Sequence, residues 1–157
     1  MTYGDNQRGY PHPDHLKVHD ITMPAIDAAA DASAYPDLGE PWQVQKVYYS
    51  VWSKARMLEM HEKFAELGLE SPFDEKWLDR PGQDDRITTR ISIDNKIAMR
   101  ALLAHRTQVD PKSPFWFGLP EEVRIDLFPF DEYILARSEV ETYPGETDLF
   151  AGLADVG

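Results

Sequence analysis

The stretch Tyr10-Pro11-His12-Pro13-Asp14-His15 stands at a junction between a loop and a helix. Turn residues precede it, and an apolar run over residues 16–26 follows it at helical spacing. A proline suits the first position of a helix, and an early aspartate faces the positive end of the helix dipole. We therefore expect a helix that begins in this stretch and continues to about Ala32.

Outward from this helix, strand and helix patterns alternate along the chain. Residues 44–51 are β-prone, and residues 87–93 alternate between apolar and polar side chains. The expected elements are the end of a strand and a loop at 1–12, a helix at 13–32, a strand at 44–51, helices at 53–67 and 71–78, a strand at 87–93, helices at 96–109 and 119–128, and a strand at 133–138. This order indicates the α/β class. Because the chain opens inside a strand-loop-helix unit, we also expect further residues upstream.

Composition limits the classes of function. The chain has 157 residues, 42% of them hydrophobic, which predicts one globular domain. A net charge of -12 argues against nucleic acid and against an anionic membrane as partners. The excess acid lies mostly in the last part of the chain, and residues 141–157 are expected to form an acidic tail. No apolar run approaches the length of a bilayer span, and the start has no signal-peptide pattern.

Two histidines flank an aspartate in the opening stretch. Of the patterns in the sequence, this one most strongly indicates a catalytic or metal-binding site. The positive end of a helix dipole disfavours imidazolium, and a neutral imidazole is the form that binds metal. Cysteine is absent, so a metal would need histidine and carboxylate ligands. His15 could bind the metal, His12 could act as an acid or stabilise charge, and Asp14 could orient an imidazole. A helix cap with two surface histidines is the other interpretation.

The remaining candidates favour structural roles. His19 lies four residues after His15, but the two do not form a known metal motif, and a core or supporting histidine is expected. His61 and His105 are expected to be structural, as is the pair Asp84-Asp85, which fits a turn before a strand. The apolar run Phe115-Trp116-Phe117 is expected to pack, or to line a pocket. The sequence contains no phosphate-binding glycine loop and no nucleophile elbow.

The opening stretch resembles the second motif of the LmbE-like (PIG-L) zinc deacetylase superfamily. Within that superfamily the resemblance narrows to the mycothiol S-conjugate amidases. It is carried by residues 46–49 with 53–57, 68–73, 84–91, 103–111 and 148–152. The similarity extends over nearly the whole chain, and these motifs are specific when taken together.

The resemblance implies a Rossmann-like α/β fold and one catalytic zinc, with iron(II) as an alternative metal. It implies hydrolysis of the amide that joins the cysteinyl and glucosaminyl parts of mycothiol S-conjugates, which are small molecules. The products would be a mercapturic acid and glucosaminyl-inositol, and the role would be detoxification, which implies a cytoplasmic protein. By position, His15 matches a zinc ligand, and His12 matches the histidine that stabilises the intermediate or protonates the leaving amine. Tyr10 matches a mobile tyrosine near the substrate carbonyl, and Asp14 matches a neighbouring aspartate.

The first motif of this superfamily, which supplies the other two zinc ligands and the general base, is absent from the chain. Residues 1–157 are therefore expected to form a partial LmbE-like hydrolase domain, the C-terminal half of the fold. We expect the isolated chain to bind metal weakly, to lack useful amidase activity and to associate. Two alternatives remain: the related N-acetyl-glucosaminyl-inositol deacetylase of mycothiol synthesis, and a truncated, non-catalytic relic.

Overall fold

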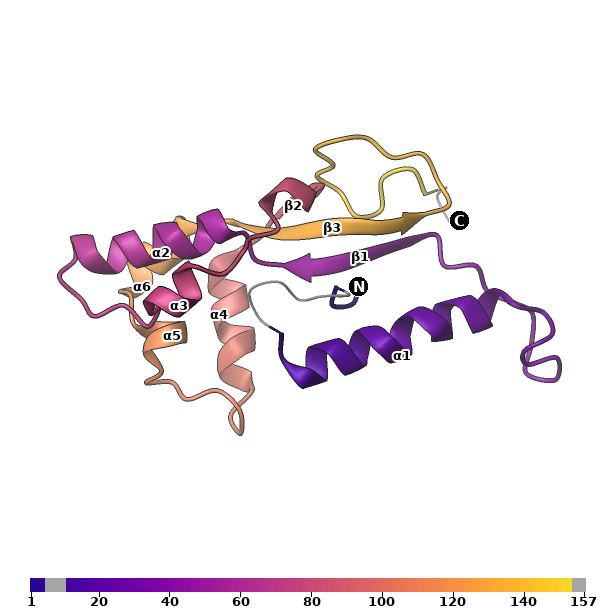
Figure 1. Ribbon diagram of the computed structural model, residues 1–157, viewed down its shortest axis with the longest axis horizontal. Coiled ribbons are helices and arrows are strands. Elements are labelled where there is room, and N and C mark those ends of the chain that lie inside the picture. The colour runs from indigo at the N-terminus through magenta and orange to yellow at the C-terminus, as the bar shows by residue number, and fades with distance from the viewer. Residues whose placement is uncertain (5–10, 154–157) are drawn as a thin grey trace.

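The computed structural model describes residues 1–4 and 11–153 of the chain (Figure 1). None of the helices in these residues has the length and hydropathy that a bilayer span requires. The elements are, in order, α1 (Pro13–Ala30), β1 (Lys46–Val51), α2 (Lys54–Glu66), α3 (Glu75–Leu78), the short 3-10 helix η1 (Asp84–Arg86), β2 (Thr89–Ser92), α4 (Asn95–Ala104), α5 (Pro114–Phe117), α6 (Glu121–Leu127) and β3 (Phe130–Ser138).

The three strands form one antiparallel sheet in the order β1-β3-β2. The central strand β3 pairs along one side with β1, from Lys46↔Ser138 to Val51↔Glu132, and along the other side with β2. The buried side chains of β1 include Val47, Tyr48, Tyr49 and Val51. The mixture of helices and strands agrees with the expected α/β class, although these three strands run antiparallel.

The start of the chain adds a short parallel pairing beside β1. The backbone N–H of Thr2 donates to the Tyr48 carbonyl at 2.9 Å, and the Ser50 N–H donates to the Thr2 carbonyl at 3.0 Å. Helix α1 connects these two parallel segments and lies along β1 (Figure 1). Met23 of α1 packs against the buried cluster of Tyr49, Val51 and Ile134. The segment, α1 and β1 thus form a β-α-β arrangement.

The other helices gather at the end of the sheet where β1 ends and β3 begins (Figure 1). Met57 and Phe64 of α2 are buried, as helical spacing predicted. An aromatic cluster joins the helices to the strand end, since Phe115 stacks on Trp52 and contacts Phe73 edge to face. This cluster makes a second apolar region beside the sheet.

The segment after β3 is attached to the sheet through a buried ion pair. Lys46 and Glu146 are separated by 100 residues, yet Lys46 Nζ lies 2.7 Å from Glu146 Oε1. The Lys46 side chain is 3% exposed and the Glu146 side chain is 1% exposed. Tyr48 donates its hydroxyl hydrogen to the same carboxylate. Lys46 Nζ also donates to the carbonyl of Ala151 at 3.0 Å. Part of the acidic C-terminal region is therefore packed against the sheet.

The bounds predicted from the sequence agree with most of the observed elements within a few residues, with three corrections. The helix predicted over 96–109 ends at Ala104, because residues 105–108 are polar and exposed and have no apolar face to bury. The backbone turns there, and the N–H of Val109 donates to the His105 carbonyl at 2.9 Å. The final strand, predicted over 133–138, begins earlier, at Phe130, because β2 pairs with its first residues. The short helix α5 was not predicted.

Candidate active site

His12 caps the N-terminus of α1. Its backbone is extended, with φ -71° and ψ 133°, and its Nδ1 accepts a hydrogen bond from the Asp14 N–H at 3.2 Å. Its carbonyl accepts the first backbone bond of the helix, from Leu16 N–H at 3.1 Å. A ring nitrogen that accepts a hydrogen bond carries no proton, so the neutral His12 ring holds its proton on Nε2. His12 is therefore both the cap that the sequence allowed and a side chain with an N–H donor at Nε2.

His15 lies one turn further along α1 and packs against Tyr3. The two rings are stacked, with centroids 3.7 Å apart and planes within 3° of parallel. Burial, together with the nearby His12, lowers the pKa of His15 below its usual value, and Asp14 offsets this only in part. The neutral imidazole is thus favoured near neutral pH, and this is the form that binds metals.

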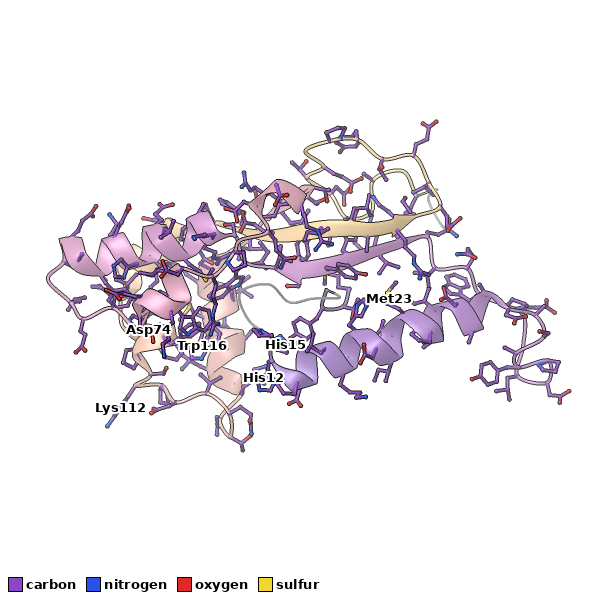
Figure 2. The ribbon with its side chains drawn as sticks, in the orientation of Figure 1. His12, His15, Met23, Asp74, Lys112 and Trp116 are labelled. Carbon is purple, nitrogen blue, oxygen red and sulfur yellow. The ribbon has the colours of Figure 1, made fainter. Side chains whose placement is uncertain are left out.

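The histidines of α1 share one partly buried stripe of the helix. Half-buried positions repeat at helical spacing, and they include His12, His15, Leu16, His19 and Met23. Figure 2 shows His12 and His15 together at the N-terminal end of the helix, with Met23 further along beneath β1. The stripe faces the sheet, so the same periodicity that packs the helix also fixes where the histidines lie.

His19 has the structural role that the sequence favoured. Its Nδ1 donates to the carbonyl of Tyr3 at 3.0 Å, and its ring contacts Tyr49 edge to face. Tyr3 therefore contacts two histidines of α1, through its ring and through its carbonyl. Sequence reasoning missed Tyr3, because a lone tyrosine near the chain start carries no motif. Its position directly before the turn residues that begin at Gly4, and next to the bridge residue Thr2, was the available signal.

The four residues predicted for the site are only partly brought together by the described structure. The rings of His12 and His15 are 5.5 Å apart. Asp14 Oδ2 lies 3.9 Å from His12 Nδ1, and the Asp14 side chain is 87% exposed. Tyr10 lies outside the described residues. The arrangement at the start of α1 thus offers one N–H donor, one neutral imidazole and one solvated carboxylate.

Comparison with known proteins finds relatives that match nearly the whole chain. The chain is 42% identical to the mycothiol S-conjugate amidase of Streptomyces coelicolor, over 99% of its own length and 55% of that protein. It is 38% identical to the 1D-myo-inositol 2-acetamido-2-deoxy-alpha-D-glucopyranoside deacetylase of Geodermatophilus obscurus, over 98% of its length and 54% of that protein. Along nearly its whole length, the chain is homologous to these hydrolases. It spans about half the length of the curated relatives it matches.

A further comparison does not distinguish between the amidase and the deacetylase. The deacetylase of the same name from Streptomyces avermitilis is 39% identical, again over 98% of the chain and 53% of that protein. No known family profile matches the chain. The relatives therefore include both an amidase and deacetylases, all matched over about half of their length.

The described residues do not contain a full set of ligands for the metal that the resemblance implies. Within residues 1–4 and 11–153, no three histidine or carboxylate side chains lie close enough to hold a metal ion. A catalytic zinc takes about three protein ligands. His12 directs Nδ1 to the Asp14 N–H, which leaves His15 as the one predicted ligand of this stretch. The described residues of this chain therefore do not make a metal site by themselves.

The other candidates have structural roles within the described chain. His61 hydrogen-bonds Ser71 Oγ through Nδ1 at 2.9 Å, and His105 is exposed at the end of α4. The carboxylate of Asp84 accepts hydrogen bonds from the N–H groups of Lys54 and Ala55, at 2.7 and 3.0 Å. Asp84 thus caps α2 from a distant turn. These observations confirm the structural interpretation of His61 and of the aspartate pair.

Proposed function

We propose that this chain forms the C-terminal half of an amidase that hydrolyses the cysteinyl-glucosaminyl amide of mycothiol S-conjugates. The products are a mercapturic acid and glucosaminyl-inositol, and the role is detoxification in the cytoplasm. The observation that carries the proposal is the 42% identity with the S. coelicolor amidase over nearly the whole chain. The β-α-β arrangement of residues 1–4, α1 and β1 supports a Rossmann-like fold of the LmbE type for the complete enzyme.

His12 is the residue for which the geometry suggests a definite catalytic role. Its Nδ1 accepts from the Asp14 backbone, so Nε2–H is the proton-bearing atom. This N–H donor stabilises the negative charge that develops on an amide oxygen. Proton transfer to the leaving amine would instead start from the doubly protonated ring and leave this neutral form. Tyr10 is proposed to act near the substrate carbonyl.

His15 is proposed as one ligand of a zinc or iron(II) ion in the complete enzyme. Its neutral ring suits that role, since burial and the nearby His12 lower its pKa. The remaining ligands and the general base come from outside the described residues. We therefore assign no catalytic step of the metal to this chain, and expect the isolated chain to bind metal weakly and to show no useful turnover.

The deacetylase is the second candidate, because relatives of that name are 38% and 39% identical over 98% of the chain. That enzyme is proposed to remove an acetyl group from the same sugar nitrogen. A non-catalytic relic is favoured only by the incomplete set of metal ligands within the described residues. It predicts sugar binding that does not depend on His15.

Two chimeras distinguish these functions. In the first, the part of the S. coelicolor amidase that this chain does not match is joined to this chain, and in the second the corresponding part of the G. obscurus deacetylase is used. Release of free amine is measured with a mycothiol S-conjugate and with the acetylated sugar-inositol. If both chimeras have the higher kcat/KM for the S-conjugate, the specificity comes from this chain and the amidase is supported. Preference for the acetylated sugar in both would support the deacetylase instead.

A further inference from the structure

A cavity of about 240 Å³ lies among the helices beside the strand end, away from the histidines of α1 in the sequence. Its walls come from α2, α4, α5, α6 and the segment around β3, and they are mostly aromatic and aliphatic. Trp52, Phe115 and Trp116 form part of the wall and hold one another in place, since Trp52 stacks on Phe115 and meets Trp116 edge to face. Trp116 is labelled in Figure 2, on the short helix α5.

Arg56 lies in the wall of this cavity, sandwiched between two aromatic rings. Its guanidinium carbon is 5.0 Å from the ring centroid of Trp52 and 5.0 Å from that of Phe128. The side chain is 12% exposed. Among its donors, one terminal N–H bonds the Phe130 carbonyl at 3.3 Å, while the buried Nε has no hydrogen-bond partner in the described chain. A buried guanidinium therefore retains an unused donor.

The carboxylates near Arg56 do not form a short ion pair with its guanidinium. Asp131, the nearer one, is 3.9 Å away, which is long for a charge-assisted hydrogen bond. Burial lowers the pKa of Arg56 and raises that of Asp131, and in each case this effect is larger than the attraction between the two. Glu132 is engaged elsewhere, by the Ser53 N–H at 2.9 Å and by Arg90 at 3.2 Å. The positive charge of Arg56 is thus incompletely neutralised.

The charge of the lining is opposite to that of the molecule. The cavity wall includes two arginines, Arg56 and Arg124, and one carboxylate, Asp131, in a chain whose net charge is -12. Arg124 is held by the wall itself, since its Nε donates to the Leu119 carbonyl at 2.9 Å and its Nη1 to the Trp116 carbonyl at 3.4 Å, whereas the Nε of Arg56 has no hydrogen-bond partner in the described chain. An excess of one positive charge among aromatic walls is complementary to a small anion with an apolar body.

We propose that this cavity binds a small organic acid whose carboxylate accepts hydrogen bonds from Arg56 and whose apolar or aromatic body packs against Trp52, Phe115 and Trp116. The volume fits this class of ligand, since a dry apolar cavity of about 150 Å³ accommodates benzene, and the remaining space holds a short carboxylate arm. Arginine is suited to a planar carboxylate because its donors form a rigid fork. The site needs neither metal nor catalysis, so it goes beyond the proposed function.

The test titrates the 157-residue chain with 3-phenylpropionate and follows the four indole N–H signals by NMR. Two matched probes separate the contributions: 3-phenylpropionamide has the ring without the charge, and propionate has the charge without the ring. We expect saturable binding of the acid, at least about tenfold tighter than the amide, because a charge-assisted bond to a buried group is lost. The signals of Trp52 and Trp116 should move, while that of Trp42, which is not part of the cavity wall and is 70% exposed, should stay.

Two variants locate the site. Ala98→Trp fills the mouth from an exposed position on α4 that lines the cavity, so folding is preserved and binding should be lost. Ala101→Trp makes the same exchange at an exposed position of α4 outside the lining and should bind as the native chain does. Arg56→Gln should remove the preference for the acid over the amide. Equal binding of acid and amide by the native chain, or unchanged binding by Ala98→Trp, would overturn the proposal.

Discussion

Tyr3 and His15 form a face-to-face stack, with ring centroids 3.7 Å apart and planes within 3°. The stack joins the first residues of the chain to the first turn of α1. Because Tyr3 also accepts a hydrogen bond from His19, it holds two histidines of the helix at once. The position of the candidate metal ligand thus depends on a parallel backbone pairing, between Thr2 and β1, as much as on the helix itself.

The pKa of His15 tests this dependence. Tyr3→Ala uncovers one face of the imidazole, and we expect the pKa of His15 to rise from its lowered value toward the ordinary 6.5. An NMR titration of the His15 ring signals measures the shift. Tyr35→Ala, at a 58% exposed tyrosine, is the control and should leave His15 unchanged. A native His15 that titrates at or above 6.5 would contradict the account.

The same shift predicts how stability depends on pH. In the unfolded chain His15 titrates near 6.5, whereas in the folded chain its pKa is lower. The unfolded state therefore binds the proton first, so the contribution of His15 is fully present above pH 6.5 and is lost as the pH falls through its folded pKa. Urea unfolding at a series of pH values should show a smaller loss over this range for His15→Gln than for the native chain. Equal losses would argue against a buried, neutral His15.

The buried pair of Lys46 and Glu146 should dominate the attachment of the C-terminal segment. Lys46→Met leaves the Glu146 carboxylate buried without its counter-ion, and we expect a loss of about 3–5 kcal/mol in the free energy of unfolding. The double variant Lys46→Met with Glu146→Leu removes both charges and should recover part of that loss. Lys63→Met, in the exposed pair with Glu66, is the control and should have no measurable effect. A double variant less stable than Lys46→Met would contradict this.

Asp84 should stabilise α2 although it lies 30 residues beyond the start of that helix. Asp84→Ala leaves the N–H groups of Lys54 and Ala55 without their acceptors, so we expect about 1–2 kcal/mol of destabilisation. Its neighbour Asp85 is exposed, and Asp85→Ala is the matched control in the same urea unfolding experiment. Equal effects of the two changes would show that the cap contributes nothing.

The elements of this chain could be predicted where local signals agree. Helix α2 has apolar residues at helical spacing, an N-cap serine and a glycine that follows its end, so its bounds were nearly right. The contacts that matter most for the site join segments far apart in the sequence, such as Tyr3 with His15, or Lys46 with Glu146. No periodicity encodes such pairs, nor the antiparallel order β1-β3-β2. The motif at residues 10–15 was recognisable because its residues are consecutive in the sequence.

The most direct test of the central claim measures metal and activity together in the amidase chimera described above. His15→Ala should lower both the bound zinc and the turnover of a mycothiol S-conjugate, whereas His61→Ala, which changes a histidine bonded to Ser71, should lower neither. Zinc content is measured on the purified chimera after dialysis, and turnover is measured on the same sample. The account predicts parallel loss of zinc and turnover in His15→Ala alone. Full zinc content and full turnover in that variant would contradict it.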